Sequence, residues 1–400
     1  MRKILFVMVA ALAFVACEKD YQTVIEKTDL ETVVHNNKVS LKQALLYAEN
    51  SINGINPTTR SAERKVKSTE LYVAKPATRS AEDVEVSFYL INYEDNEGFA
   101  MVSTDSRATP VYAYSDEGNL TPYDLENNPG LQIFMEGTIE NYQNEVASPR
   151  LFEDPTNRPD SIVTELPLPT VVYNGGVYYL ETTLEDFVKE PLLTTRWHQG
   201  APYADNCPGG VAGCAPIAVA QIMAYHKYPA QFNGHTYNWN AITATDILYS
   251  GTAGAISAAQ LVYDIGDTAG INYEIGTETS IHLLDNTLEA FDYNYSTPAS
   301  YNADRVVENI NNGQPVLMDG YNNQFDGHTW VIDGYNRINT RYTYYYIDRP
   351  NFVYETRIVG SVDYFHCNMG LGGRNDGYYL SSSLLHNNSI CTIYDITPNN

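Results

Sequence analysis

The chain of 400 residues is poor in cysteine, in tryptophan and in positive charge. It contains 5 Cys and 3 Trp, and 24 Lys and Arg stand against 49 Asp and Glu, which gives a net charge of −25. So few cysteines exclude a fold built on a disulfide framework, although they still allow one disulfide, from Cys207 to Cys367 or Cys391. The shortage of positive charge excludes a nucleic-acid-binding surface and makes anionic membranes poor partners.

The apolar run at the N-terminus, Ile4 to Val15, is too short to span a bilayer. It follows the basic residues Arg2 and Lys3 and ends at Ala16-Cys17, so residues 1–17 resemble a lipoprotein-type signal peptide with Cys17 at the cleavage site. Conventional secretory cleavage nearby is the alternative. In either case we expect an exported protein, either secreted or held at the outer membrane or cell surface by a lipid on Cys17.

The length of the chain predicts two domains, or a pro-segment followed by a catalytic domain. We assign residues 18–185 to the first and 186–400 to the second. In the first, Ser40 to Gln43 form a capping-box pattern that opens a helix. Alternating apolar residues then predict a hairpin that turns at 94–98. A strand at 111–114 and an amphipathic helix beyond Pro129 complete a module that we interpret as structural or inhibitory.

Two polar stretches separate these elements from one another and from the second module. The sequence Thr-Arg-Ser-Ala-Glu occurs at 59–63 and again at 78–82, in a basic region that we interpret as a linker. Residues 150–168 are rich in Pro, Asp and Thr, which is typical of an exposed linker. We therefore expect activating cleavage between this linker and Pro191, near residues 181–190.

The chemistry of the second module is centred on Cys214. The glycines before it, the proline at 216 and the apolar run up to Met223 predict a buried helix with Cys214 at its N-terminal end. Unpaired N–H groups and the helix dipole favour a thiolate there, as a nucleophile requires. Further along the chain, His328 follows Gly327 and begins a predicted strand. Gln199 precedes the cysteine, and Asn368 lies in a glycine-rich segment near the C-terminus.

These residues carry a resemblance to the streptopain-like cysteine peptidases, a papain-like clan whose members are made as zymogens. The matching segments are Gln199 to Tyr203, Gly213-Cys214, Ala220 to Pro229, Gly327-His328 with Val331 to Tyr335, and Asn368 with its glycines. The order Gln, Cys, His, Asn is that of the papain-like fold. The segment Gly98 to Arg107 and the segment Ala113 to Gly118 also resemble the pro-domain of this family.

The resemblance implies an α+β fold, in which a helical lobe carrying Cys214 and an antiparallel β lobe carrying His328 follow an α+β pro-domain. It also implies a cysteine endopeptidase that hydrolyses peptide bonds and is inhibited by its own pro-domain. Cys214 would attack the carbonyl carbon and His328 would protonate the leaving amine. Gln199 and the N–H of Cys214 would stabilise the oxyanion, and Asn368 would orient His328. No metal or cofactor is implied.

Two other functions stay open at the level of sequence. The family usually has Trp where Met369 and Leu371 stand, and those indoles cover the histidine and its partner. Because these tryptophans are replaced, one alternative is a catalytically silent binding protein that keeps the same fold. A peptidoglycan amidase that uses the same Cys and His is the other.

Overall fold

The computed structural model describes residues 37–55, 64–74, 84–147, 170–174, 176–274, 277, 280–349, 351–385 and 389–399. The predicted signal peptide with Cys17 and both Thr-Arg-Ser-Ala-Glu copies lie outside these residues. Among the helices described, none is long and apolar enough to cross a membrane.

The N-terminal module, by which we mean the described residues up to Ala147, contains the elements that its sequence predicts and, in addition, a short helix, Pro122–Asn127, that was not predicted. They are α1 (Leu41–Ile55), β2 (Ser87–Tyr93), the 3-10 turn η2 (Glu94–Asn96), β3 (Phe99–Ser103), β4 (Val111–Ser115), α2 (Pro122–Asn127) and α3 (Pro129–Ala147). Ser40 caps α1 as predicted, because its hydroxyl accepts from the N–H of Gln43. One strand was not predicted: β1 (Val66–Val73) pairs with β2 inside the region that we interpreted as a linker.

The C-terminal module, by which we mean residues 190–399 where described, begins with the turn η4 (Pro208–Gly210). Its helices are α4 (Cys214–His226), α5 (Trp239–Ile242), α6 (Ala253–Thr268), α7 (Ile281–Ala290), α8 (Ala303–Asn311) and α9 (Ser381–Leu385). Its long strands are β11 (Val316–Tyr321), β12 (Gly327–Tyr346), β13 (Val353–Asn368) and β14 (Gly377–Leu380). Shorter strands are β7 (Gln231–Phe232), β8 (His235–Thr236), β9 (Tyr293–Asn294), β10 (Ala299–Ser300), β15 (Cys391–Ile393) and β16 (Thr397–Pro398).

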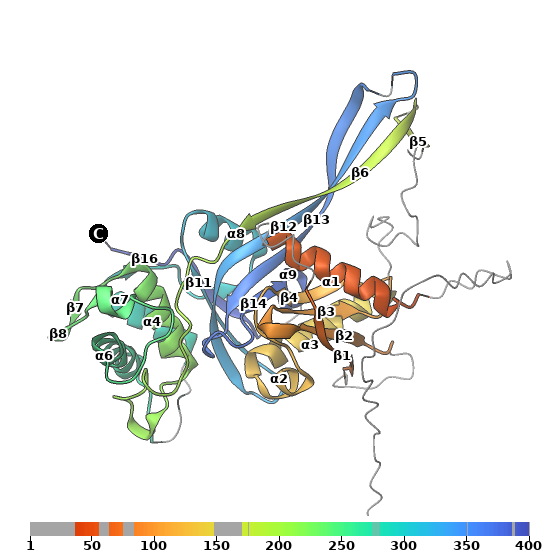
Figure 1. The fold of residues 1–400 in the computed structure, drawn as a ribbon. Helices are drawn as coiled ribbons and strands as arrows, with labels where there is room; N and C mark the ends of the chain where they lie inside the picture. Colours follow the sequence, from red (N-terminus) through yellow and green to blue (C-terminus); the bar gives the residue numbers. More distant parts are fainter. Residues whose placement is uncertain are drawn as a thin grey trace, which may run out of the picture. The chain divides into compact units, whose positions relative to one another are not determined.

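A single sheet runs through both modules (Figure 1), in the order β1-β2-β3-β4-β14-β13-β12-β11-β15-β10. The junction is the antiparallel pair of β4 and β14, where Tyr114 lies opposite Tyr378. Because backbone hydrogen bonds cross this junction, the N-terminal module extends the sheet of the C-terminal module as well as packing against it.

The segment between the modules forms β5 (Thr170–Tyr173) and β6 (Gly176–Lys189). β6 pairs with β12 from Tyr178 to Lys189, and with β12 and β13 it forms an arm that projects from the body of the molecule (Figure 1). Our expected domain boundary at 185 and the expected cleavage region near 181–190 therefore fall within or next to a hydrogen-bonded strand.

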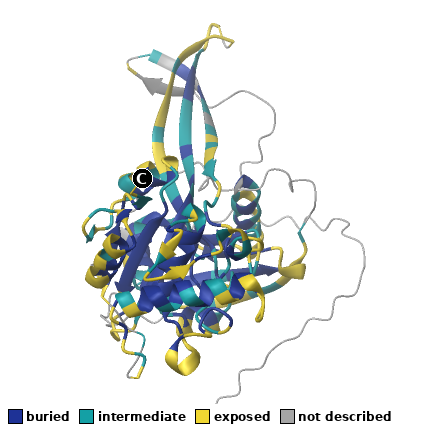
Figure 2. Ribbon diagram, turned by 90° about the vertical axis from the view of Figure 1, so that its left-hand side faces the viewer, coloured by how far each residue is buried: buried dark blue, intermediate teal, exposed yellow. Residues whose placement is uncertain are grey.

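The buried side chains form two large cores, and Figure 2 shows the buried ribbon concentrated in the body of the molecule. The first core joins the N-terminal module to one face of the sheet, where α3 packs against β11, β12 and α9. The second surrounds α4, α6 and α7. Leu317 and Val331, from β11 and β12, belong to the second core, while Met318 and Trp330 belong to the first. Alternation along these strands thus divides the sheet between the two cores.

Candidate active site

Cys214 is the first residue of α4, as the sequence predicts. Gly213 before it has a φ of 89° and a ψ of 157°, and a Cβ at this position would lie 2.9 Å from Cβ of Thr277. Both the backbone conformation and the close approach favour glycine at this position. The residues of α4 from Ala215 to Ala224 are all buried, so the helix is anchored in the second core and holds the thiol in a fixed place at its N-terminal end.

Cys214, His328 and Gln199 line one pocket of about 290 Å³. Gln199 comes from the loop before α4, and His328 comes from the start of β12. The pocket is also lined by Asp319, by Thr329, and by Asn128 and Pro129 of the N-terminal module. The three residues that the sequence assigns to nucleophile, acid and oxyanion donor therefore share one cavity, and the N-terminal module forms part of its wall.

The imidazole of His328 does not hydrogen-bond to Cys214 in this state. Its Nε2 donates to the carbonyl oxygen of Met369 at 3.0 Å, and the residue is 3 % exposed. The ring lies parallel to the indole of Trp330, with centroids 6.1 Å apart. Against it lies Gly130 of α3, where a Cβ would stand 2.6 Å from Cδ2 of His328. The N-terminal module thus packs directly on the histidine.

Burial shifts both candidate catalytic groups away from their charged forms. It raises the pKa of the Cys214 thiol, although the N–H of Thr329, which lies 3.4 Å from Sγ, opposes the shift. Burial lowers the pKa of His328 to about 4, with the Met369 carbonyl acting in the opposite direction. A neutral thiol and a neutral imidazole are the states expected of an enzyme that is not yet active, in contrast to the thiolate that the helix dipole alone favours.

Gln199 is tied by its backbone to the segment just before Cys214, since its carbonyl accepts from the N–H of Ala212 at 2.8 Å. The same loop is joined to the segment after Asn368. The N–H of Gly372 donates to the carbonyl of Trp197 at 2.8 Å, and His198 forms a β-bridge with Leu371. The two loops and the start of α4 therefore hold each other in place around the pocket.

Asn368 is the last residue of β13 and its side chain is buried. Its Nδ2 donates to the carbonyl of Thr195 at 2.9 Å, and its Oδ1 accepts from Nε2 of Gln221 at 3.0 Å. In this state the amide therefore anchors the start of the module, and the role predicted for it as the orienter of His328 stays a prediction. Sequence reasoning missed Gln221, although a glutamine within an apolar helix was a visible signal.

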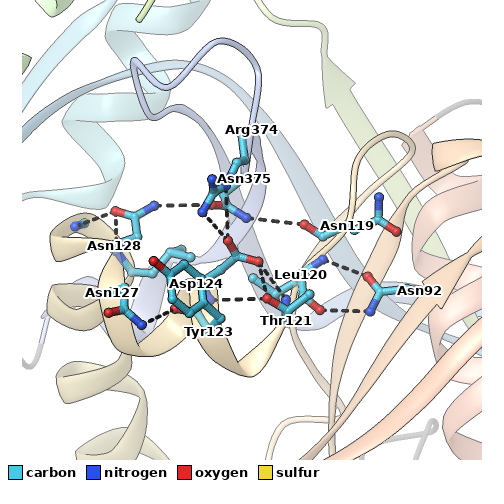
Figure 3. Close-up of polar contacts among 12 residues, drawn as sticks. Asn92, Asn119, Leu120, Thr121, Tyr123, Asp124, Asn127, Asn128, Arg374 and Asn375 are labelled. Carbon is cyan, nitrogen blue, oxygen red and sulfur yellow. Dashed lines mark hydrogen bonds and ion pairs between the residues drawn. The ribbon is translucent and has the colours of Figure 1, made fainter. Parts of the chain in front are cut away.

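A set of polar contacts connects the N-terminal module to the loop that follows Asn368 (Figure 3). Arg374 donates to Asp124 of α2 at 2.7 Å, and Asn128 donates to Asn375 at 3.4 Å. Asn128 also caps α3, because its Oδ1 accepts from the N–H of Gly130 at 2.9 Å. The loop held in this way contains Met369, whose carbonyl accepts from His328.

Two further buried carboxylates, Asp333 and Asp376, lie in this part of the module, and the sequence analysis assigned them no role. Asp333 accepts from Nδ1 of His366 at 2.6 Å, and Asp376 accepts from the N–H of Met369 at 2.8 Å. Burial raises the pKa of Asp376 to about 7. Burial alone would lower the pKa of His366, but Asp333 raises it above the ordinary histidine value. Asp376 thus holds the backbone of the loop at Met369, Asp333 holds His366, and neither carboxylate lines the pocket.

The four cysteines at 207, 214, 367 and 391 are all free in the structure, so the bridge left open by the sequence is not formed here. In the described part of the chain, no cluster of His, Cys, Asp or Glu has the arrangement of a metal site.

Comparison with known families assigns the two modules to two different families. Residues 197–379 match the Peptidase C10 family, and residues 36–146 match the Spi protease inhibitor. The chain is 24 % identical over 362 residues to streptopain of Streptococcus pyogenes, an alignment that covers 78 % of this chain and 80 % of the relative. It is 23 % identical over 380 residues to the thiol protease/hemagglutinin PrtT of Porphyromonas gingivalis, covering 86 % of this chain and 39 % of the relative.

Among solved structures, the chain is similar to a fragment of prointerpain A from Prevotella intermedia. The two share 21 % sequence identity and superpose with a TM-score of 0.52, over 82 % of this chain and 98 % of the fragment. The likeness supports the predicted α+β fold, with an N-terminal module placed before a papain-like domain.

Proposed function

Since the chain belongs to the streptopain-like cysteine peptidases of the Peptidase C10 family and is made as a zymogen, we propose that Cys214 and His328 form its catalytic pair. One observation carries this proposal: both residues line a single pocket together with Gln199. The pocket adjoins the N-terminal end of α4, where free N–H groups are available to a developing negative charge.

In the active enzyme, His328 leaves the Met369 carbonyl and takes the proton of the Cys214 thiol. The thiolate attacks the carbonyl carbon of the peptide bond, and the imidazolium protonates the leaving amine. Water then attacks the thioester, with His328 as general base, and releases the acid product. The Gln199 side-chain amide and the N–H of Cys214 stabilise the oxyanion in both steps.

The latent state has a physical basis in this proposal. Gly130 packs on the imidazole, Asn128 and Pro129 face the pocket, and burial holds thiol and imidazole neutral. Removal of the N-terminal module admits water and substrate and frees the imidazole to approach the sulfur. We propose that Asn368 then orients His328, after an adjustment of the loop that carries Met369.

Covalent labelling of Cys214 tests the proposal. The full-length precursor and the matured enzyme are treated with an epoxide peptide probe at neutral pH, and the labelled residue is identified by mass spectrometry. We expect fast labelling of Cys214 after maturation, slow labelling before it, and hydrolysis of a casein substrate only after it. A matured wild-type protein in which Cys214 resists the probe contradicts the assignment, and the variant Cys214→Ala provides the blank.

Export and the lipid anchor on Cys17 are proposals from the sequence alone. They are tested by metabolic labelling with a fatty acid, which should mark the wild-type chain and leave Cys17→Ser unmarked.

A further inference from the structure

Asp319 lies at the active-site pocket and has no part in the mechanism above. It belongs to β11, directly opposite Thr329 of β12, and its side chain lines the pocket together with Cys214. The residue is only 4 % exposed. Burying an ionised carboxylate to this extent destabilises the folded protein unless a cation or hydrogen-bond donors compensate the charge.

The hydrogen bonds of Asp319 satisfy one of its two oxygens. Oδ1 accepts from the hydroxyl of Thr329 at 2.7 Å, whereas Oδ2 has no hydrogen-bond partner in the part of the chain that the structure describes. The described residues that line the pocket include no Lys or Arg, and the other carboxylate among them, Asp326, is exposed. Among the described residues that line the pocket, His328 alone can carry a positive charge near neutral pH, and in this state burial holds its imidazole neutral.

The charge of Asp319 also acts on the catalytic pair. Burial raises the pKa of Asp319 itself to about 6, so the carboxyl is largely ionised at neutral pH. In the ionised form it contributes to the raised pKa of the Cys214 thiol. The same charge raises the pKa of His328, so it favours the imidazolium while it disfavours the thiolate. As long as His328 is neutral, a negative charge at this position opposes thiolate formation. A cation that arrives with the substrate would remove that penalty at the moment when the nucleophile is needed.

We propose that Asp319 is a specificity-determining residue, which binds a lysine or arginine side chain of the substrate next to the scissile bond. The proposal rests on the proposed function, because it requires Cys214 to attack a peptide bound in this pocket. An ammonium or guanidinium group that enters the pocket would donate to Oδ2 of Asp319. A charge-assisted hydrogen bond of this kind is stronger than one between neutral groups.

Two other roles for Asp319 make different predictions. If the carboxylate only supports Thr329, or if it only attracts the imidazolium of His328, its loss affects every substrate to the same extent. A specificity role affects substrates according to their charge. The ratio of kcat/KM between charged and uncharged substrates therefore separates these possibilities.

The experiment uses enzyme matured from the full-length chain and pairs of fluorogenic peptides. Within a pair, arginine is replaced by citrulline, which has nearly the same shape and no charge, at one position beside the scissile bond. The variant Asp319→Asn keeps an acceptor for the Thr329 hydroxyl and loses the charge. The variant Asp326→Asn is the control, because it removes the exposed carboxylate of the same pocket.

For the wild type we expect arginine to exceed citrulline in kcat/KM by about 10- to 100-fold at one of the flanking positions. The preference should nearly vanish in Asp319→Asn and persist in Asp326→Asn. Titration of Cys214 with the epoxide probe gives the concentration of active enzyme for each variant, so partial misfolding does not distort the ratio.

Equal cleavage of both peptides by the wild type overturns the proposal, whatever the variants do. So does an arginine preference that survives in Asp319→Asn. If no peptide is cleaved and Cys214 is not labelled, the proposed function itself fails. If labelling and casein cleavage are normal without a charge preference, only the role of Asp319 fails.

Discussion

The Nε2 atom of His328 lies 3.0 Å from the carbonyl oxygen of Met369, so the loop after β13, and not Cys214, holds the imidazole. Gly130 of the N-terminal module packs against the same edge of the ring, next to Cδ2 and Nε2. Met369 is one of the two residues that stand in place of the family's usual tryptophans, and its backbone supplies the contact. The latent arrangement of the histidine therefore requires no particular side chain at position 369.

The contact between Gly130 and His328 predicts that Gly130→Ala weakens latency. A Cβ placed 2.6 Å from Cδ2 of the ring forces either α3 or the imidazole to move. We expect faster labelling of Cys214 in the intact precursor, measured with the epoxide probe. The control is Gly118→Ala, which also strains the N-terminal module through a φ of 79° but places its methyl group more than 4 Å from any neighbour. Equal labelling rates in both variants would argue against a specific contact.

The ion pair between Arg374 and Asp124 predicts that its loss accelerates maturation of the precursor by a modest factor. Asp124 also completes the capping box of α2 with Thr121, so the variant to use is Arg374→Gln, which leaves that cap in place. The arginine side chain is 59 % exposed, and such a pair contributes about 0.5–1 kcal/mol. If maturation passes through transient opening of the module, the precursor should disappear about two- to fivefold faster. A time course on gels measures this, and a slower course than wild type would count against the idea.

Gln199→Ala should reduce turnover without preventing attack on a probe. Loss of one oxyanion donor costs about 10²- to 10³-fold in kcat in other enzymes. Alkylation of Cys214 by iodoacetamide develops no oxyanion, so its rate should change little. The neighbouring His198→Ala is the control, because His198 does not line the pocket. A variant that loses alkylation together with turnover would indicate a structural role for Gln199.

The raised pKa of Cys214 and the lowered pKa of His328 predict a change in pH profile on maturation. A raised thiol pKa means less thiolate at neutral pH. In the precursor, alkylation of Cys214 should therefore increase with pH through an inflection above the ordinary cysteine value. In the matured enzyme, pairing with the imidazolium should move the inflection to lower pH. Quantifying the Cys214 peptide by mass spectrometry separates it from the other cysteines, and identical profiles before and after maturation would contradict the expected pairing.

Several elements of this fold could be predicted because their signals are local. The capping box at Ser40, the turn at 94–98 and the apolar run after Cys214 each occupy a few consecutive residues. The convergence of Gln199, Cys214 and His328 on one pocket was predictable only through the family resemblance, since no local pattern brings distant segments together.

The rest of the site depends on contacts that leave no trace in the sequence. A backbone carbonyl, such as that of Met369, can hold a histidine whatever residue carries it. The junction of Tyr114 with Tyr378 joins two strands far apart in the chain, and each strand separately has the pattern of an ordinary buried strand. The hydrogen bond between Asn368 and Gln221 likewise could not be predicted, because it depends on how α4 packs against the end of β13.

The burial of Asp319 predicts that the carboxylate proposed to determine specificity also destabilises the folded protein, by an amount that depends on pH. Its pKa is raised from an ordinary value of 3.8 to about 6, so the folded protein binds more protons than the unfolded chain between these values. Stability is therefore lost as the pH rises through this range, by about 2–3 kcal/mol for a shift of this size. Asp319→Asn should unfold at higher urea concentration than wild type at pH 7.5, and the difference should nearly disappear at pH 4. Unfolding curves of the full-length precursor at both pH values measure this, and a variant that is less stable than wild type at pH 7.5 would mean that the carboxylate is compensated within the fold.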